Sequence, residues 1–184
     1  HERLVGSEMC IRDNKYNHLT LMGFSLTHLS GTGIPDLGDF LFIPGTGEMK
    51  LEPGTHEDPD QGYRSRYSHD KEWASPNYYA VELADYGVKA EMTSGVRSGM
   101  FRFTYPESDN AFIMIDMNHT LWQSCEWSNL RMINDSTITG YKLVKGWGPE
   151  RHVYFTATFS KKLTGLRFVQ DLSLIHISEP TRRS

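Results

Sequence analysis

Met100-Phe-Arg-Phe-Thr-Tyr105 is the stretch that most clearly indicates the fold, because it alternates at a period of two. Its three aromatic side chains fall on one face of an extended chain, and Met100, Arg102 and Thr104 fall on the other. Alternation of this kind is typical of a β-strand with one buried face. Aromatic residues are also favoured in strands, so composition and period agree.

Similar segments lie on both sides of this stretch. Residues 79–83 and 153–159 alternate in the same way, and residues 112–117 form a nearly continuous apolar run, typical of a central strand. Turn-forming residues separate these segments, and no full-length amphipathic helix or internal repeat stands out. The pattern predicts an all-β protein built as an antiparallel β-sandwich. The chain has 184 residues, enough for one domain with a sizeable core.

Composition argues against several classes of partner. The net charge is −4 and no stripe of Lys and Arg is present, so a nucleic-acid surface is not expected. No apolar run approaches the ~20 residues that a membrane-spanning helix needs, so no membrane partner is expected. Cys10 and Cys125 permit one disulfide without requiring it, and two unpaired or buried thiols are the favoured interpretation.

Residues 23–39 hold four glycines, one histidine and two aspartates between two apolar runs. Gly31, Gly33 and Gly38 permit positive φ and let another molecule approach the backbone closely. Dense glycine with several polar side chains suits a loop that grips a polyhydroxylated or charged ligand. The polar candidates on this glycine loop are His28, Ser30, Asp36 and Asp39.

His28, Asp36 and Asp39 can form a metal site, a His–Asp catalytic pair or a grip for sugar hydroxyls. Metal sites commonly use three or four ligands, so these residues alone are weak support for one. Sugar binding is more natural, because carboxylates accept hydrogen bonds from hydroxyl groups and backbone N–H groups donate to them. Asp36 and Asp39 suit turn capping equally well. The loop has neither G-x-G-x-x-G nor G-K-[ST] spacing, which excludes a nucleotide-binding loop.

Arg66 and Trp147 are further candidates for the binding of a sugar. Arg66 can order the glycine loop or reach a glycan hydroxyl, or it can form a surface ion pair with Asp70 or Glu72. Trp147 lies between two glycines, which leave space beside its ring for a sugar to stack. Two other tryptophans stay open between core and ligand roles: Trp122 and Trp127.

Several separated motifs resemble glycoside hydrolase family 92. These are FSLTHLSGTGIPDLGD, YRSRYSHDKEWASPNYYAVEL, DYGVKAEMTSGVRSGMFRFTYP, DNAFIMIDMNHTL, ITGYKLVKGWG and VYFTATFSKKL, and they occur in the order of the family over residues 21–170. The resemblance is to the N-terminal domain of calcium-dependent, exo-acting, inverting α-mannosidases. The chain departs from the family pattern at Leu26, where a second histidine is expected.

The resemblance implies a two-domain enzyme. The acid, the base and the calcium ligands of the family belong to an (α/α)₆ barrel that follows the sandwich, so no catalytic residue or metal ligand is expected in this chain. Asp116 lies in an apolar run where burial would raise its pKa, but it has no evident partner carboxylate. The sandwich is expected to wall the mannose pocket with these substrate-binding residues: His28, Ser30, Gly31, Gly33, Asp36, Asp39, Arg66 and Trp147.

The resemblance also implies partners and location. Mannose-containing glycans and the barrel domain are the expected partners, calcium is the expected cofactor, and a secreted, periplasmic or cell-surface location is expected, with a role in N-glycan degradation.

Two rival functions are a non-catalytic carbohydrate-binding or scaffold sandwich and a metal hydrolase using His28, His69 and Asp70.

The C-terminal segment is expected to lie outside the domain. Residues 172–182 read LSLIHISEPTR, which matches one translated frame of a sequencing-library adapter. We therefore expect residues 1–171 to form the sandwich, truncated at both ends, and residues 172–184 to be a non-native tail. The sandwich alone is expected to be inactive.

Overall fold

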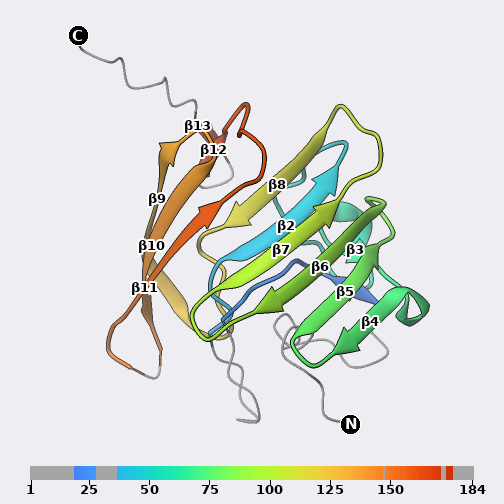
Figure 1. Cartoon of the computed structure of the whole chain (residues 1–184). Helices are drawn as coiled ribbons and strands as arrows, with labels where there is room; N and C mark the ends of the chain where they lie inside the picture. Colours follow the sequence, from blue (N-terminus) through green and yellow to red (C-terminus); the bar gives the residue numbers. More distant parts are fainter. Residues whose placement is uncertain (1–18, 28–36, 147, 171–172, 176–184) are drawn as a thin grey trace.

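The protein is built from antiparallel strands, as the alternation predicts. The computed structural model describes residues 19–27, 37–146, 148–170 and 173–175 (Figure 1). The helices within these residues are two short 3₁₀ turns, η1 (Pro59–Gln61) and η2 (His69–Lys71). No helix in this part is long and apolar enough to cross a membrane.

Four consecutive strands form the largest sheet, in the order β4-β5-β6-β7. Val81, Val88 and Ala90 are fully buried on one face of it. Phe101 and Phe103 pack against the same cluster, which confirms the face that their alternation predicts. Because each pair is antiparallel and sequential, tight turns suffice to connect them. The strands are β4 (Glu72–Ser75), β5 (Tyr78–Leu83), β6 (Val88–Ser94) and β7 (Gly99–Thr104).

Two smaller strand pairs accompany the large sheet, and Leu21 belongs to the same buried cluster as Val81 and Val88. β2 (Leu41–Thr46) pairs with β8 (Ala111–Asp116), and β1 (Thr20–Leu21) pairs with β3 (Ser65–Arg66). A bridge between Phe24 and Phe42 links the chain after β1 to β2. The apolar run over 112–117 does form a strand, but β2 is its only partner among the described residues, so the predicted central position is not seen there.

A three-stranded sheet has the order β11-β10-β9 and lies beside β2 and β8 (Figure 1). Its inner face packs through Phe155, whose ring centroid is 4.5 Å from that of Phe40 and 5.9 Å from that of Phe42. Gly140 makes room for this ring, because a Cβ there would lie 2.0 Å from Cε1 of Phe155. The strands are β9 (Ser124–Asn134), β10 (Thr137–Lys145) and β11 (Arg151–Thr158).

A last hairpin follows this sheet. β12 (Phe168–Gln170) pairs with β13 (Ser173–Ile175), so the backbone of three residues of the expected tail forms a strand. That residues 172–184 are non-native stays a prediction.

Candidate functional site

The two ends of the glycine loop are tied together at its base. The N–H of Gly38 donates to the carbonyl of Thr27 at 3.0 Å, and the N–H of Leu121 donates to the carbonyl of Leu37 at 2.9 Å. Gly38 has a φ of +69°, and a Cβ there would lie 2.6 Å from Cγ of Leu121. The loop therefore needs glycine at position 38 for both backbone conformation and space, as the sequence predicts.

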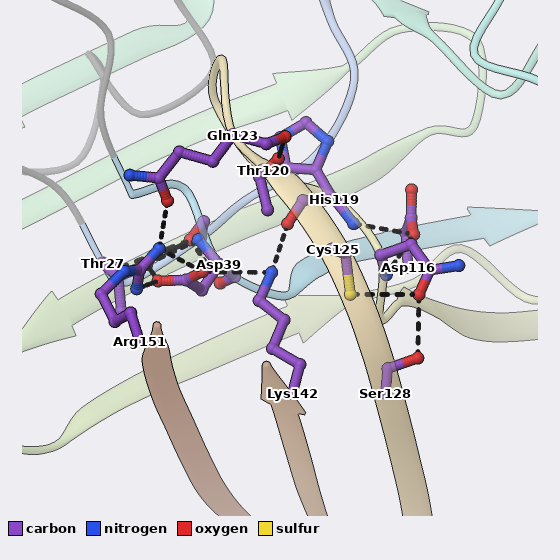
Figure 2. Close-up of polar contacts among 12 residues, drawn as sticks. Thr27, Asp39, Asp116, His119, Thr120, Gln123, Cys125, Ser128, Lys142 and Arg151 are labelled. Carbon is purple, nitrogen blue, oxygen red and sulfur yellow. Dashed lines mark hydrogen bonds and ion pairs between the residues drawn. The ribbon is translucent and has the colours of Figure 1, made fainter. Parts of the chain in front are cut away.

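Asp39 lies at this base and has several polar contacts (Figure 2). Nη1 and Nη2 of Arg151 donate to Oδ2 at 2.6 Å and to Oδ1 at 3.1 Å. Nζ of Lys142 lies 3.1 Å from Oδ1, and the side chains of Asp39 and Lys142 have no exposed surface. One carboxylate is thus held by two cations, one of them fully buried. We call Asp39, Lys142 and Arg151 the Asp39 cluster.

Burial and charge oppose each other in this cluster. Burial by itself raises the pKa of Asp39, but the hydrogen bond from Arg151 and the charges of Lys142 and Arg151 outweigh it, so the pKa is lowered from its usual value. Burial lowers the pKa of Lys142, and the attraction of Asp39 only partly opposes this. The carboxylate is therefore ionised at neutral pH, and its charge is compensated inside the protein.

Two hydroxyl residues near the start of the glycine loop, Ser25 and Thr27, fix the backbone around Asp39. Oγ1 of Thr27 accepts the N–H of Asp39 at 2.6 Å and donates to its Oδ2 at 3.2 Å. The hydroxyl of Ser25 donates to the carbonyl of Asp39 at 2.7 Å. These contacts favour the structural interpretation of Asp39 over direct contact with a sugar, because its carboxylate oxygens are buried and already bonded.

The turn between β8 and β9 is joined to the same cluster (Figure 2). Nη2 of Arg151 donates to Oε1 of Gln123, and Nζ of Lys142 donates to the carbonyl of His119 at 2.5 Å. Oδ1 of Asp116 accepts the N–H groups of Asn118 and His119, which shapes the start of the turn. Asp116 thus serves as a turn-forming residue at the end of β8.

His119 and Cys125 complete the surroundings. Burial lowers the pKa of His119, more strongly than the charge of Asp116 raises it, so the imidazole is neutral at pH 7. Sγ of Cys125 lies 3.5 Å from Oδ1 of Asn118, and burial raises the pKa of this free thiol. Cys10 lies outside the described residues.

Arg66 lies elsewhere, on β3 at the far side of the large sheet from β10 and β11 (Figure 1). Its guanidinium donates to Asp85 at 2.7 Å and to Asp60 at 2.6 Å, and these contacts raise its pKa, that with Asp60 most. The ion-pair interpretation is therefore supported, with partners other than the predicted Asp70 and Glu72. Beside it is an open polar hollow of about 280 Å³, lined by residues including Arg64, Asp60 and Asp85.

The structure thus brings Asp39 into a defined site and leaves Arg66 apart from it. No three His, Cys, Asp or Glu side chains of the described residues gather as a metal site requires, so these residues do not fit the calcium that the resemblance implies. His69, considered for a metal hydrolase, faces Glu72 at 2.5 Å. The remaining predicted site residues lie outside the described part and stay predictions: His28, Ser30, Gly31, Gly33, Asp36 and Trp147.

The sequence alone did not point to the two basic residues of the Asp39 cluster, Lys142 and Arg151. Lys142 lies on β10 between Gly140 and Val144, at an inward position of an alternating strand. A charged residue at a core position signals a buried partner, because an unpaired charge there is costly. Arg151 and Gln123 carry no comparable local signal.

Comparison with known proteins decides the family. A model of the glycosyl hydrolase family 92 N-terminal domain matches residues 10–181. The chain belongs to glycosyl hydrolase family 92. The family 92 resemblance seen in the separated motifs is thereby confirmed. No match was found among curated proteins.

Solved structures agree with the family 92 assignment. The chain is 94% identical to the family GH92 alpha-mannosidase BT3965 from Bacteroides thetaiotaomicron, with a TM-score of 0.86. The match covers 92% of this chain and 23% of that one. The same enzyme in complex with mannoimidazole matches with equal identity and TM-score, and there the match covers 22% of the solved chain. The chain therefore spans less than a quarter of the length of these relatives.

Proposed function

We propose that this chain serves as the N-terminal β-sandwich of an inverting, exo-acting α-mannosidase. In this role it forms part of the wall of the mannose pocket and packs against the catalytic barrel. The observation that carries the proposal is the 94% identity to an α-mannosidase that has been solved with mannoimidazole bound.

The described residues support a role in shaping the pocket rather than in proton transfer. An inverting glycosidase needs two carboxyl groups roughly 6.5–9.5 Å apart, one to protonate the leaving group and one to activate water. Asp39 is held between two cations, and Asp116 accepts two backbone N–H groups. The acid and base are therefore proposed to come from the barrel.

The Asp39 cluster supports the proposed role of the glycine loop. A sugar-binding loop gains affinity when its backbone is held in the bound shape before the ligand arrives. The loop leaves and re-enters the sandwich at Thr27 and Gly38, which are hydrogen bonded to each other, and Asp39 fastens this point to β10 and β11. We propose that the cluster fixes the two ends of the loop from which His28 would contribute to the mannose pocket.

The test uses a chimera of the full-length Bacteroides enzyme in which residues 19–170 of this chain replace the matching segment. His28→Ala is expected to lower kcat/KM by roughly ten-fold with an unchanged unfolding midpoint, because a lost hydrogen bond costs about 0.5–1.5 kcal/mol and more when a buried partner is stranded. The chain alone is expected to hydrolyse no aryl α-mannoside. Unfolding of the His28→Ala variant with full activity in its folded fraction would remove the loop from the pocket.

A non-catalytic carbohydrate-binding sandwich is the second candidate, and one observation favours it. Trp127, Tyr141 and Tyr154 form a row of contacting rings across β9, β10 and β11, with centroids 5.2 and 4.7 Å apart. Trp127 is 54% exposed and Tyr154 is 70% exposed. Exposed rings in a row suit stacking on sugars, but they suit an interface with the barrel equally.

Binding to the isolated chain separates the two candidates. The aromatic row predicts retention of the chain on immobilised α-mannan, lost in Trp127→Ala, if the chain is a binding module. If the aromatic row instead packs against the barrel, the isolated chain should not be retained, should bind a hydrophobic dye and should self-associate.

The same proposal includes calcium in the barrel, a location outside the cytoplasm and a role in N-glycan degradation. Calcium is tested by chelation of the full-length enzyme.

A further inference from the structure

We propose that the outer face of the sheet β11-β10-β9, which lies opposite the face of Phe155, binds neutral α-linked mannose chains. The rings of Trp127, Tyr141 and Tyr154 lie in a row on this face, with centroids 5.2 and 4.7 Å apart. The choice of mannose as the sugar rests on the proposed function, and the surface would serve the mannosidase itself in addition to hydrolysis. Rings alone suit a sugar or a protein equally, so the residues around them decide between the two.

The outward positions of these strands have the composition of a surface that meets water. Ile138 and Val144 on β10 are buried, on the inner face of the sheet. The outward positions of β10 and β11 that follow the rings carry four threonines: Thr137, Thr139, Thr156 and Thr158. Such alternation is typical of an antiparallel sheet with one face on the core and one in water. The core of a protein–protein interface is more apolar than this, so a hydrated ligand fits the face better.

The threonines form a ladder of hydroxyl groups beside the rings. They face each other across β10 and β11 in two pairs, with 3.4 Å between the Oγ1 atoms of each pair: Thr137 with Thr158 and Thr139 with Thr156. The next outward pair along the same strands is Tyr141 with Tyr154, so rings and hydroxyl groups adjoin on one face. Each hydroxyl group can both donate and accept, which is what the hydroxyl groups of a sugar require of a binding surface.

The rings are open to a ligand, and the charges at their end of the sheet are compensated. Tyr154 is 70% exposed and Trp127 is 54% exposed. Two pairs of a basic and an acidic side chain lie at this end, with N to O distances of 3.4 and 3.8 Å: Lys145 with Glu126 and His152 with Glu150. Compensated charge complements a neutral ligand and disfavours a nucleic acid or another polyanion, which needs unpaired cations.

A chain of hexoses can use both kinds of group that this face offers. The C–H groups on one face of a pyranose pack on aromatic rings, and its hydroxyl groups exchange hydrogen bonds with those of threonine. On β9, Asn129 and Arg131 add N–H donors to the same face, opposite Tyr141 and Thr139 in the register. Because the rings lie on three neighbouring strands and the threonines continue along two of them, we expect a ligand of several sugars.

The experiment uses the full-length chimera described above, in native gels that contain α-mannan. Saturating mannoimidazole is present, so that retardation does not report the site at which the solved relative binds this ligand. Trp127→Ala and Tyr154→Ala each remove a ring, Tyr154→Phe keeps the ring, and Thr156→Val removes one hydroxyl group at nearly constant shape. Trp73→Ala is the matched control, since Trp73 is 49% exposed on β4, in another sheet. The measurements are the Kd for mannan, from the retardation, and the unfolding midpoint.

The parent chimera is expected to be retarded by mannan. Trp127→Ala and Tyr154→Ala are expected to raise the Kd by about five-fold or more, and Thr156→Val by about two-fold or more. Tyr154→Phe and Trp73→Ala are expected to leave the Kd close to that of the parent. Retardation does not depend on turnover, whereas the proposed function fails if the parent hydrolyses no aryl α-mannoside, so the two failures are distinguishable.

The inference is overturned if the parent is not retarded, or if Trp127→Ala and Tyr154→Ala raise the Kd no more than Trp73→Ala does. Equal losses of binding in Tyr154→Phe and Tyr154→Ala would also overturn it, because stacking depends on the ring that phenylalanine keeps. So would an unfolding midpoint that falls by several degrees more in Tyr154→Ala than in Trp73→Ala, because the ring then packs against the rest of the enzyme.

Discussion

Replacing Asp39 by asparagine removes one charge from between two cations and keeps the shape of the side chain. Lys142 is fully buried and loses its counter-ion, whereas Arg151 keeps 29% of its surface in solvent. Loss of one partner of a buried ion pair costs about 3–5 kcal/mol. We expect the lower end, because Lys142 still donates to the carbonyl of His119 and lies over the ring of Phe40.

That cost is large enough to measure by thermal unfolding of the chain at pH 7. At about 2–4 °C per kcal/mol for a chain of this size, a loss of about 3 kcal/mol lowers the midpoint by about 6–12 °C. Asp60→Asn is the matched control, because its carboxylate also binds an arginine but is 73% exposed. Exposed pairs contribute about 0–1 kcal/mol, so the control should move the midpoint by a few degrees at most.

A second substitution tests the mechanism. Adding Lys142→Met to Asp39→Asn removes the stranded charge and is expected to recover a large part of the lost midpoint. If Asp39→Asn lowers the midpoint no more than Asp60→Asn does, the cluster does not stabilise the sandwich. If Lys142→Met adds its full cost to that of Asp39→Asn, the two residues act independently and the buried-pair argument is wrong.

Three further outcomes are expected. Because the pKa of Asp39 is lowered on folding, its contribution to stability is complete above the unfolded pKa of about 3.9 and is lost as pH falls through the lower folded value. The difference in unfolding midpoint between the parent chain and Asp39→Asn should therefore be constant from pH 5 to 7 and shrink below about pH 4. A difference that grows on acidification would contradict this. Gly38→Ala should be more destabilising than Gly47→Ala. Both positions have positive φ, which costs about 1–2 kcal/mol of strain each, but only at Gly38 would a Cβ clash with Leu121. Equal losses of stability in the two variants would mean that the clash with Leu121 is relieved without cost. Deleting residues 172–184 should leave the midpoint unchanged or raised, although it removes the β13 half of the last hairpin; a loss of several degrees would show that this segment is native.

The sequence by itself determined the fold class, several of the strands and the family. Alternation is a local property, so the inward faces of β7 and β11 could be predicted residue by residue. Family membership followed from motifs in order, which requires no knowledge of contacts. The positive φ of Gly38 was also predictable, because glycine in a dense polar loop signals it.

Tertiary structure alone decided which side chains of these segments contact one another. Asp39 and Arg151 are 112 positions apart, and their pairing depends on β11 lying beside β2. From the sequence, Arg66 was as good a candidate for substrate binding as Asp39. In the structure it pairs with Asp60 and Asp85 at another part of the surface. The physical reason is that charge pairing acts over a few ångströms in space, whereas sequence patterns report only the direction of a side chain relative to its own strand.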